Sequence, residues 1–301
     1  MGRWVALAVV AAVLGLAAPA ARAEDPPFVN WPSLLPPLAV GFTESTFDTC
    51  RDGSPACVEA TLAEMDRRLA VHDAACNHNA LFLRNYRLVT QTYADLPDGY
   101  FDDDRYLAHE DAVFAKLYFD AEDAWRAGRV ADVPEAWRIA FAAADGRKVQ
   151  GAGNLLLGIN AHVQRDMPYL LAGLGLVAPD GRSRKPDHDR FNAVLNASYD
   201  DVLEQAAEQD DPDLARYDLP GTADGFLEFQ AVAGWREGVW RNAERLVRAR
   251  NPAERAAVAR SIEANAATWA RMIQAAFPYN ALFTPARRDA LCRARDYPNP
   301  R

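Results

Sequence analysis

Several short motifs that mark well-known enzyme classes are absent from this chain. The sequence has no G-x-S-x-G elbow for a serine nucleophile, no P-loop, no glycine fingerprint for dinucleotides and no H-E-x-x-H zinc helix. It also has no C-x-x-C pair and only five histidines. These absences exclude many familiar enzymes, and they leave few side chains that could carry metal or acid–base chemistry.

Positive charge is scarce as well. The chain has 33 Lys and Arg residues against 42 Asp and Glu residues, which gives a net charge of −9. The first 23 residues hold two of the basic residues and none of the acidic ones, so residues 24–301 carry 31 minus 42, or −11. Because an acidic protein repels phosphate backbones and anionic lipid surfaces, we expect no nucleic-acid partner.

The N-terminus has the pattern of a secretory signal peptide. Arg3 precedes an apolar run over residues 4–19, and Ala21-Arg22-Ala23 matches the A-x-A cleavage pattern before Glu24. The run is shorter than the ~20 residues that span a bilayer, and no later segment reaches that length without a charge. Residues 1–23 are therefore predicted to be a signal peptide, and the chain to be secreted or in the cell envelope with no transmembrane segment after cleavage.

Four cysteines favour disulfides in an exported chain. Cys50, Cys57, Cys76 and Cys292 allow three pairings. A bond between Cys50 and Cys57 would close a short loop, and a bond between Cys76 and Cys292 would tie the C-terminus to the early helices. The sequence leaves the connectivity open.

Helical periodicity dominates the chain after Pro55, and strand-like alternation is absent. Residues 24–54 are rich in proline and are predicted to form an irregular arm. The fold class is therefore all-α, with residues 55–301 forming one domain, a single bundle of roughly eight to nine helices. The predicted helical segments are 57–74, 78–95, 103–128, 134–145, 149–176, 187–208, 222–249, 252–278 and 284–294.

The stretch from Gly158 to Pro168 suggests where chemistry could lie. His162 and Asp166 are four residues apart and share a helix face with aliphatic side chains, so both are predicted to be buried. A buried charge needs a partner. Pro168 lacks an amide donor and is expected to disfavour helical geometry at Met167.

Two further histidines are predicted to point inward. His109 lies on the stripe of Tyr106 and Val113, and His188 continues the face of Phe191. With His162 and Asp166 they could bind Zn²⁺ or another divalent metal in a helical bundle. Asp189 or Glu110 would then position or deprotonate a metal-bound water. The first hypothesis is therefore that the chain is a metal-dependent hydrolase that acts on phosphoesters or lipids.

The alternative hypothesis assigns the same histidines a structural role. Buried imidazoles are commonly hydrogen-bonded, and here they could join neighbouring helices. The chain would then be a non-catalytic exported protein that binds a small apolar or carbohydrate ligand, or a cell-envelope partner. It predicts a pocket lined by aromatic side chains such as Tyr106, Trp125, Trp235 and Trp240. Neither hypothesis indicates an oligomeric state.

Three segments carry a resemblance to a known family. Val133-Pro134-Glu135-Ala136-Trp137, the run Leu155 to Pro168 with its GxNAHxxxDxP pattern, and His188-Asp189-Arg190-Phe191-Asn192 resemble a bacterial, mainly actinobacterial, family known only as a domain of unknown function. The resemblance covers most of residues 57–295. It implies one helical domain and supplies no reaction.

A looser resemblance concerns His162-x-x-x-Asp166-x-Pro168. This pattern is similar to the H-x-x-x-D helix of zinc-dependent phospholipase C and the S1/P1 nucleases, which are exported, helical and disulfide-bearing, and whose His and Asp bind zinc. The chain departs from that group in two ways. Its mature end is expected at Glu24 instead of a metal-binding tryptophan, and Tyr169-Leu170 follows the proline where a histidine is expected.

Overall fold

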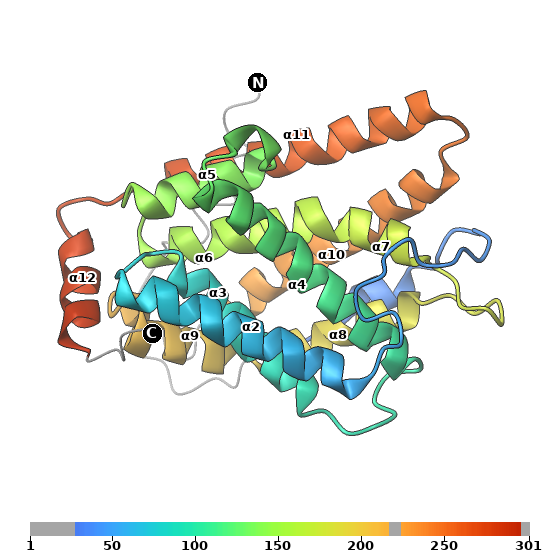
Figure 1. Cartoon of the computed structure of the whole chain (residues 1–301), viewed down its shortest axis with the longest axis horizontal. Coiled ribbons are helices and arrows are strands. Elements are labelled where there is room, and N and C mark those ends of the chain that lie inside the picture. Colours follow the sequence, from blue (N-terminus) through green and yellow to red (C-terminus); the bar gives the residue numbers. More distant parts are fainter. Residues whose placement is uncertain (1–27, 217–223, 296–301) are drawn as a thin grey trace.

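The computed structural model describes residues 28–216 and 224–295, and the predicted signal peptide lies outside these ranges. In the described ranges the chain is built from helices, with two isolated β-bridges, Val149 with Pro278 and Val177 with Ser183, and no strand. The prediction of an all-α fold is confirmed. Figure 1 shows α11 running along the top of the bundle, α12 standing at its left end and α2 crossing its front.

The helices match the predicted segments closely. The segment predicted at 149–176 contains a π-helix between two α-helices, and the one predicted at 187–208 is divided at Ser198. The helices are α2 (Pro55–Ala74), α3 (Ala80–Ala94), α4 (Asp104–Arg126), α5 (Glu135–Asp145), α6 (Gly151–Ile159), η3 (Asn160–Asp166), α7 (Met167–Leu174), α8 (Lys185–Ala197), α9 (Tyr199–Gln209), α10 (Asp224–Arg248), α11 (Pro252–Ala276) and α12 (Pro285–Ala294), with short 3₁₀ turns η1 (Trp31–Leu34), η2 (Val130–Asp132) and η4 (Leu214–Arg216).

Capping side chains explain where two of the long helices begin. The carboxylate of Asp103 accepts a hydrogen bond from the backbone N–H of Tyr106 at the start of α4. The amide oxygen of Asn251 accepts one from the backbone N–H of Glu254 at the start of α11, where Pro252 occupies the first turn. Such caps satisfy amides that have no partner within the helix.

The expectation that Pro168 disturbs the helix at Met167 was wrong. Met167 has helical angles, φ −61° and ψ −36°, and α7 begins there. The preceding π-turn accommodates the proline, because the N–H of Met167 bonds to the carbonyl of His162, five residues earlier. A π-turn widens the helix by one residue and is common near functional sites.

The N-terminal arm, residues 28–54, lies against α8 and α10. The Asn30 side-chain amide donates to the carbonyl of Asp189 at 2.8 Å, and Nζ of Lys185 donates to the carbonyl of Pro32 at 2.9 Å. Apart from η1 the described arm has no helix. These contacts fix an irregular segment on the surface of the bundle.

Two disulfides use all four cysteines. Cys50 pairs with Cys57, with their Cα atoms 5.7 Å apart, and Cys76 pairs with Cys292, with their Cα atoms 5.8 Å apart. The second bond joins the turn after α2 to α12. The prediction of disulfides is confirmed, and the structure decides which of the three pairings is used. None of the described helices is long and apolar enough to cross a membrane.

The core consists of three groups of buried apolar side chains. The first is centred on Trp137 and Phe141, the second on Leu170 and Trp240, and the third on Leu81. Between them the packing is incomplete, and this gap is the candidate site described next.

Candidate functional site

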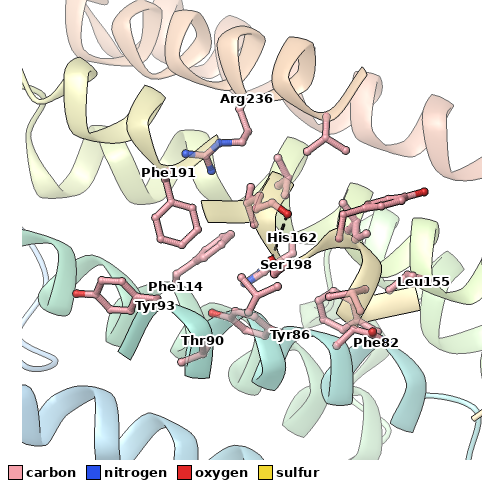
Figure 2. A pocket seen from close by; sticks show the side chains of 18 of the residues that line it. Phe82, Tyr86, Thr90, Tyr93, Phe114, Leu155, His162, Phe191, Ser198 and Arg236 are labelled. Atoms are coloured by element: carbon pink, nitrogen blue, oxygen red, sulfur yellow. Dashed lines mark hydrogen bonds between the residues drawn. The ribbon is translucent and has the colours of Figure 1, made fainter. Parts of the chain in front are cut away.

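A cavity of about 270 Å³ lies inside the bundle. The helix α3 forms one wall with six side chains that recur every three or four residues and so share one face over about 16 Å. Figure 2 shows Tyr86, Thr90 and Tyr93 on one side of this space, and Phe191 and Arg236 on the other. The six α3 residues are Phe82, Asn85, Tyr86, Val89, Thr90 and Tyr93.

The other walls come from helices distant in sequence, and most of their side chains are apolar. Phe82, Met167 and Leu155 belong to the first, second and third core groups respectively, so the cavity lies where the three groups meet. The lining residues from these walls include Leu107, Glu110, Asp111 and Phe114 of α4, Leu155, Leu156 and Ile159 of α6, His162 and Val163 of η3, Met167 of α7, His188, Phe191 and Leu195 of α8, and Val232 and Arg236 of α10.

His162 is held in the cavity wall by aromatic rings. Its imidazole stacks on the ring of Phe114, with centroids 3.4 Å apart and planes at 7°, and it meets Tyr86 edge-on at 4.6 Å. Burial lowers the pKa of His162, while its hydrogen bond to Asp166 opposes that shift. The imidazole is therefore neutral at physiological pH.

Asp166 orients this imidazole from behind the wall. Its Oδ2 lies 3.4 Å from Nδ1 of His162 and accepts a hydrogen bond from Nε1 of Trp137 at 2.8 Å, while Oδ1 accepts one from Arg165 at 2.8 Å. With Nδ1–H directed at the carboxylate, Nε2 of His162 is left with a lone pair. This nitrogen is buried and has no hydrogen-bond partner within the described residues.

His188 also lines the cavity, but both of its ring nitrogens have partners. Nε2 lies 3.1 Å from the carbonyl of Arg236, and Nδ1 lies 3.3 Å from Nη2 of Arg236. Burial and the nearby guanidinium lower the pKa of His188 far below its ordinary value. The same guanidinium also donates to Asn192 at 2.7 Å and to the carbonyl of His188 at 2.6 Å. His188 and Arg236 thus form a closed structural unit.

Glu110 and Asp111 bring two neighbouring carboxyl groups to the cavity. Burial raises the pKa of Glu110 to about 7, although the charges of Arg236 and Arg184 oppose the rise. Burial also raises the pKa of Asp111 to about 8, with a further contribution from Glu110. In the described parts of the chain neither carboxyl group forms an ion pair, so the cavity holds two acids without a bonded cation.

Five polar atoms of cavity-lining side chains are buried without a hydrogen-bond partner among the residues that the structure describes. Native proteins satisfy most buried polar atoms, so a group of unsatisfied atoms around one cavity requires an explanation. Water or a ligand in the cavity would supply one. The five atoms are Oδ1 of Asn85, the hydroxyl of Tyr86, Oγ1 of Thr90, Oδ2 of Asp111 and Nε2 of His162.

The six residues predicted for a metal centre are only partly brought together. Glu110, His162 and His188 line the cavity, whereas Asp166 lies behind His162. His109 faces the N-terminal arm, where Nδ1 bonds to the carbonyl of Thr49 at 2.7 Å and Nε2 to Oγ of Ser45 at 2.8 Å. Asp189 pairs with Lys185 at 2.7 Å outside the cavity.

The described parts of the chain are residues 28–216 and 224–295. No group of three or more His, Cys, Asp or Glu side chains there is spaced to hold a metal ion. The metal centre and its catalytic carboxylates stay a prediction, to be tested by metal analysis.

The four aromatic residues predicted to line a pocket do not line this cavity, although Trp235 lines a separate pocket beside α11. Tyr106 lies under the guanidinium of Arg184 at 3.7 Å, and Trp235 packs against Trp269 at 5.3 Å. Nε1 of Trp125 bonds to Asp145 and Nε1 of Trp240 bonds to Glu244. None of the four predicted residues lines the cavity.

The sequence does contain a feature that indicates the α3 wall of the cavity. Asn85 and Thr90 interrupt the apolar face of the helix predicted at 78–95, and polar side chains on such a face indicate an unusual environment.

The model of one protein family, a family of unknown function named DUF5995, matches residues 58–276. The chain belongs to this family. No curated protein and no solved structure gives a significant match. The DUF5995 match extends from α2 to the end of α11 and so includes the cavity walls from Phe82 to Arg236. Membership confirms that the chain belongs to a family of unknown function. It does not bear on the predicted bacterial origin, on the GxNAHxxxDxP pattern or on the likeness to zinc phospholipases and nucleases.

Proposed function

We propose that this protein binds a small, largely apolar molecule in the cavity at the centre of its helical bundle. The observation that carries the proposal is the cavity itself, about 270 Å³ with mainly aromatic and aliphatic walls and a few convergent polar atoms. Ligand sites have this composition, and their volumes begin at roughly 300 Å³.

Packing energetics support a ligand. Protein interiors are close-packed, whereas the apolar side chains around this pocket lack van der Waals partners on one side. The helices around the cavity are otherwise densely packed, with Phe82, Trp137 and Tyr118 in mutual ring contact. A molecule that fills the space would restore the missing contacts and remove apolar surface from water.

Binding is proposed to occur after export. The predicted signal sequence and the two disulfides support this location, because such bonds persist in oxidising compartments. A binding protein of this kind could carry or sequester its ligand outside the cytoplasm.

The metal-dependent hydrolase acting on phosphoesters or lipids has less support. Both ring nitrogens of His109 and of His188 are engaged, so a metal would have to displace existing hydrogen bonds. Elemental analysis of protein purified without chelator or a histidine tag tests this alternative. Near-stoichiometric zinc, manganese or iron in the wild type that is lost in His162→Ala and in Asp166→Ala would support the hydrolase alternative.

Binding can be tested with a neutral dye that fluoresces in apolar surroundings. Val89→Phe places a ring in the cavity, whereas Val258→Phe makes the same change at a half-buried position on α11 away from it. We expect one dye molecule to bind the wild type and Val258→Phe, and Val89→Phe to bind at least about tenfold more weakly, since overlap with the ligand removes several kcal/mol of contact. Equal binding by all three proteins would refute the proposed site.

Mass spectrometry of organic extracts provides an independent test. Wild-type protein released with its native disulfides should yield an apolar compound that is depleted in extracts of Val89→Phe. An equal yield from both proteins would show that the compound binds elsewhere.

A further inference from the structure

Most of the five unsatisfied polar atoms of the cavity are hydrogen-bond acceptors, and this limits the classes of ligand that could satisfy them. This inference rests on the proposed function, because it concerns the polar end of a molecule that occupies the cavity. Three of the five atoms are acceptors. Asn85 uses its amide N–H₂ to bond the carbonyl of Leu81 at 2.6 Å, which leaves Oδ1 to accept. Nε2 of His162 accepts because Nδ1–H faces Asp166.

The carboxyl groups can add negative charge to this set of acceptors, because a cation beside them favours the ionised form that burial disfavours. Oδ2 of Asp111 is buried without a partner within the described part of the chain. Asp111 and Glu110 line the same cavity as the rings of Tyr86 and Tyr93. Phe114 follows Asp111 by three residues and stacks on His162. The acceptors, the acids and the rings therefore line the same cavity.

Arg236, the one buried cation among the described lining residues, is already committed. Arg236 donates to Asn192, to the carbonyl of His188 and to the sulfur of Met167. An anionic ligand would have to compete for this guanidinium while lying beside two carboxyl groups. A cationic ligand would instead meet unpaired acids and the faces of aromatic rings, which attract cations.

We propose that the ligand is an amphiphilic amine whose protonated nitrogen is held by Asp111, with Glu110, Asn85 and His162 as further contacts, and whose apolar body lies along α3. A primary ammonium group has three N–H donors, and Oδ2 of Asp111, Oδ1 of Asn85 and Nε2 of His162 are three acceptors without partners among the described residues. An alcohol has one donor and would leave two of them unsatisfied.

The test compares three probes with the same ten-carbon chain: decylamine, decan-1-ol and decanoate. Each displaces the neutral dye from the wild type, from Asp111→Asn, from Glu110→Gln and from Asp120→Asn. Asp120 is an exposed residue of the same helix, paired with Lys116, so its variant controls for surface charge. About 0.15 M salt screens unspecific attraction of the amine to the acidic surface.

We expect decylamine to bind the wild type and Asp120→Asn at least about tenfold more tightly than decan-1-ol or decanoate. Asp111→Asn should weaken decylamine binding by about tenfold or more, because it removes one partner of a buried charge pair, and it should leave decan-1-ol binding unchanged. Glu110→Gln should weaken the amine in the same direction. Circular dichroism verifies that each variant is folded.

The possible failures are distinct. Binding of decan-1-ol or decanoate as tightly as the amine would overturn the ligand class and leave an apolar binding site in place. Decylamine binding that is equal in the wild type and in both cavity variants would also overturn the inference. If the dye and all three probes fail to bind the folded wild type, the cavity holds only water and the proposed function itself is wrong.

Discussion

The imidazole of His162 lies flat against the ring of Phe114, with centroids 3.4 Å apart and an angle of 7° between the planes. The two residues come from η3 and α4, which are not adjacent in sequence. The Nδ1 side of the imidazole faces Asp166, which lies outside the cavity, and the rest of the ring lines the cavity. We therefore expect both the stability of the fold and the proposed binding to depend on this residue.

Replacement of His162 by Ala is expected to destabilise the fold. The change removes ring contacts with Phe114 and Tyr86 and leaves the Asp166 carboxylate with one donor fewer. We expect the free energy of unfolding to decrease by about 2–4 kcal/mol, measured by urea denaturation. An unchanged denaturation midpoint would contradict the structural role of the imidazole.

Replacement of Asp111 by Asn should stabilise the ligand-free protein. An acid buried without a partner in the described residues is costly, and functional sites often sacrifice stability in this way. We expect an increase of about 1 kcal/mol in the free energy of unfolding, whereas Asp120→Asn should change it by less than about 0.5 kcal/mol. A loss of stability in Asp111→Asn would mean that its carboxyl group supports the fold.

Acid should destabilise the protein through His78. Burial, together with the charge of Arg288, lowers the pKa of His78 to about 4, although the hydrogen bond to Asp289 opposes the shift. Between pH 6.5 and about 4 the unfolded chain binds a proton at this residue that the folded chain does not, so stability falls as the pH falls through this window.

His78→Asn isolates this contribution from other titrating groups. We expect the wild type to lose up to ~1.4 kcal/mol per pH unit more than the variant between pH 6.5 and 4.5, measured by urea denaturation at each pH. Parallel curves for the two proteins would show that His78 titrates alike in both states.

The two disulfides should contribute unequally to stability. Cys76 and Cys292 are 216 residues apart in sequence, whereas Cys50 and Cys57 are 7 apart. A crosslink restricts the unfolded chain more when it closes a longer loop, so replacing both Cys76 and Cys292 by Ser should cost about 4–5 kcal/mol and the other pair about 2–3 kcal/mol. Calorimetry on both double variants measures the difference, and equal losses would contradict this order.

Local signals in the sequence determined the helices. Apolar residues at spacings of three and four, Asp103 and Asn251 as caps, and Pro252 in a first turn are all short-range features, and the helices begin and end close to where they indicate. The i, i+4 pairing of His162 with Asp166 is local for the same reason and occurs as predicted.

Only the tertiary structure decided which inward-facing groups share a space. His109, Glu110 and Asp111 are consecutive, yet His109 bonds to the N-terminal arm while the two acids line the cavity, because successive helical residues point about 100° apart. The partners of each depend on elements far away in sequence. Trp240 and Tyr86 both lie on the apolar face of a predicted helix. Trp240 is fully packed in the core, whereas Tyr86 borders the cavity.

The helix periodicity of this chain thus determined which faces are buried, since burial of an apolar stripe is a property of the segment itself. Helix periodicity could not predict the cavity, because the shape of a cavity depends on how side chains from six or more helices fit together.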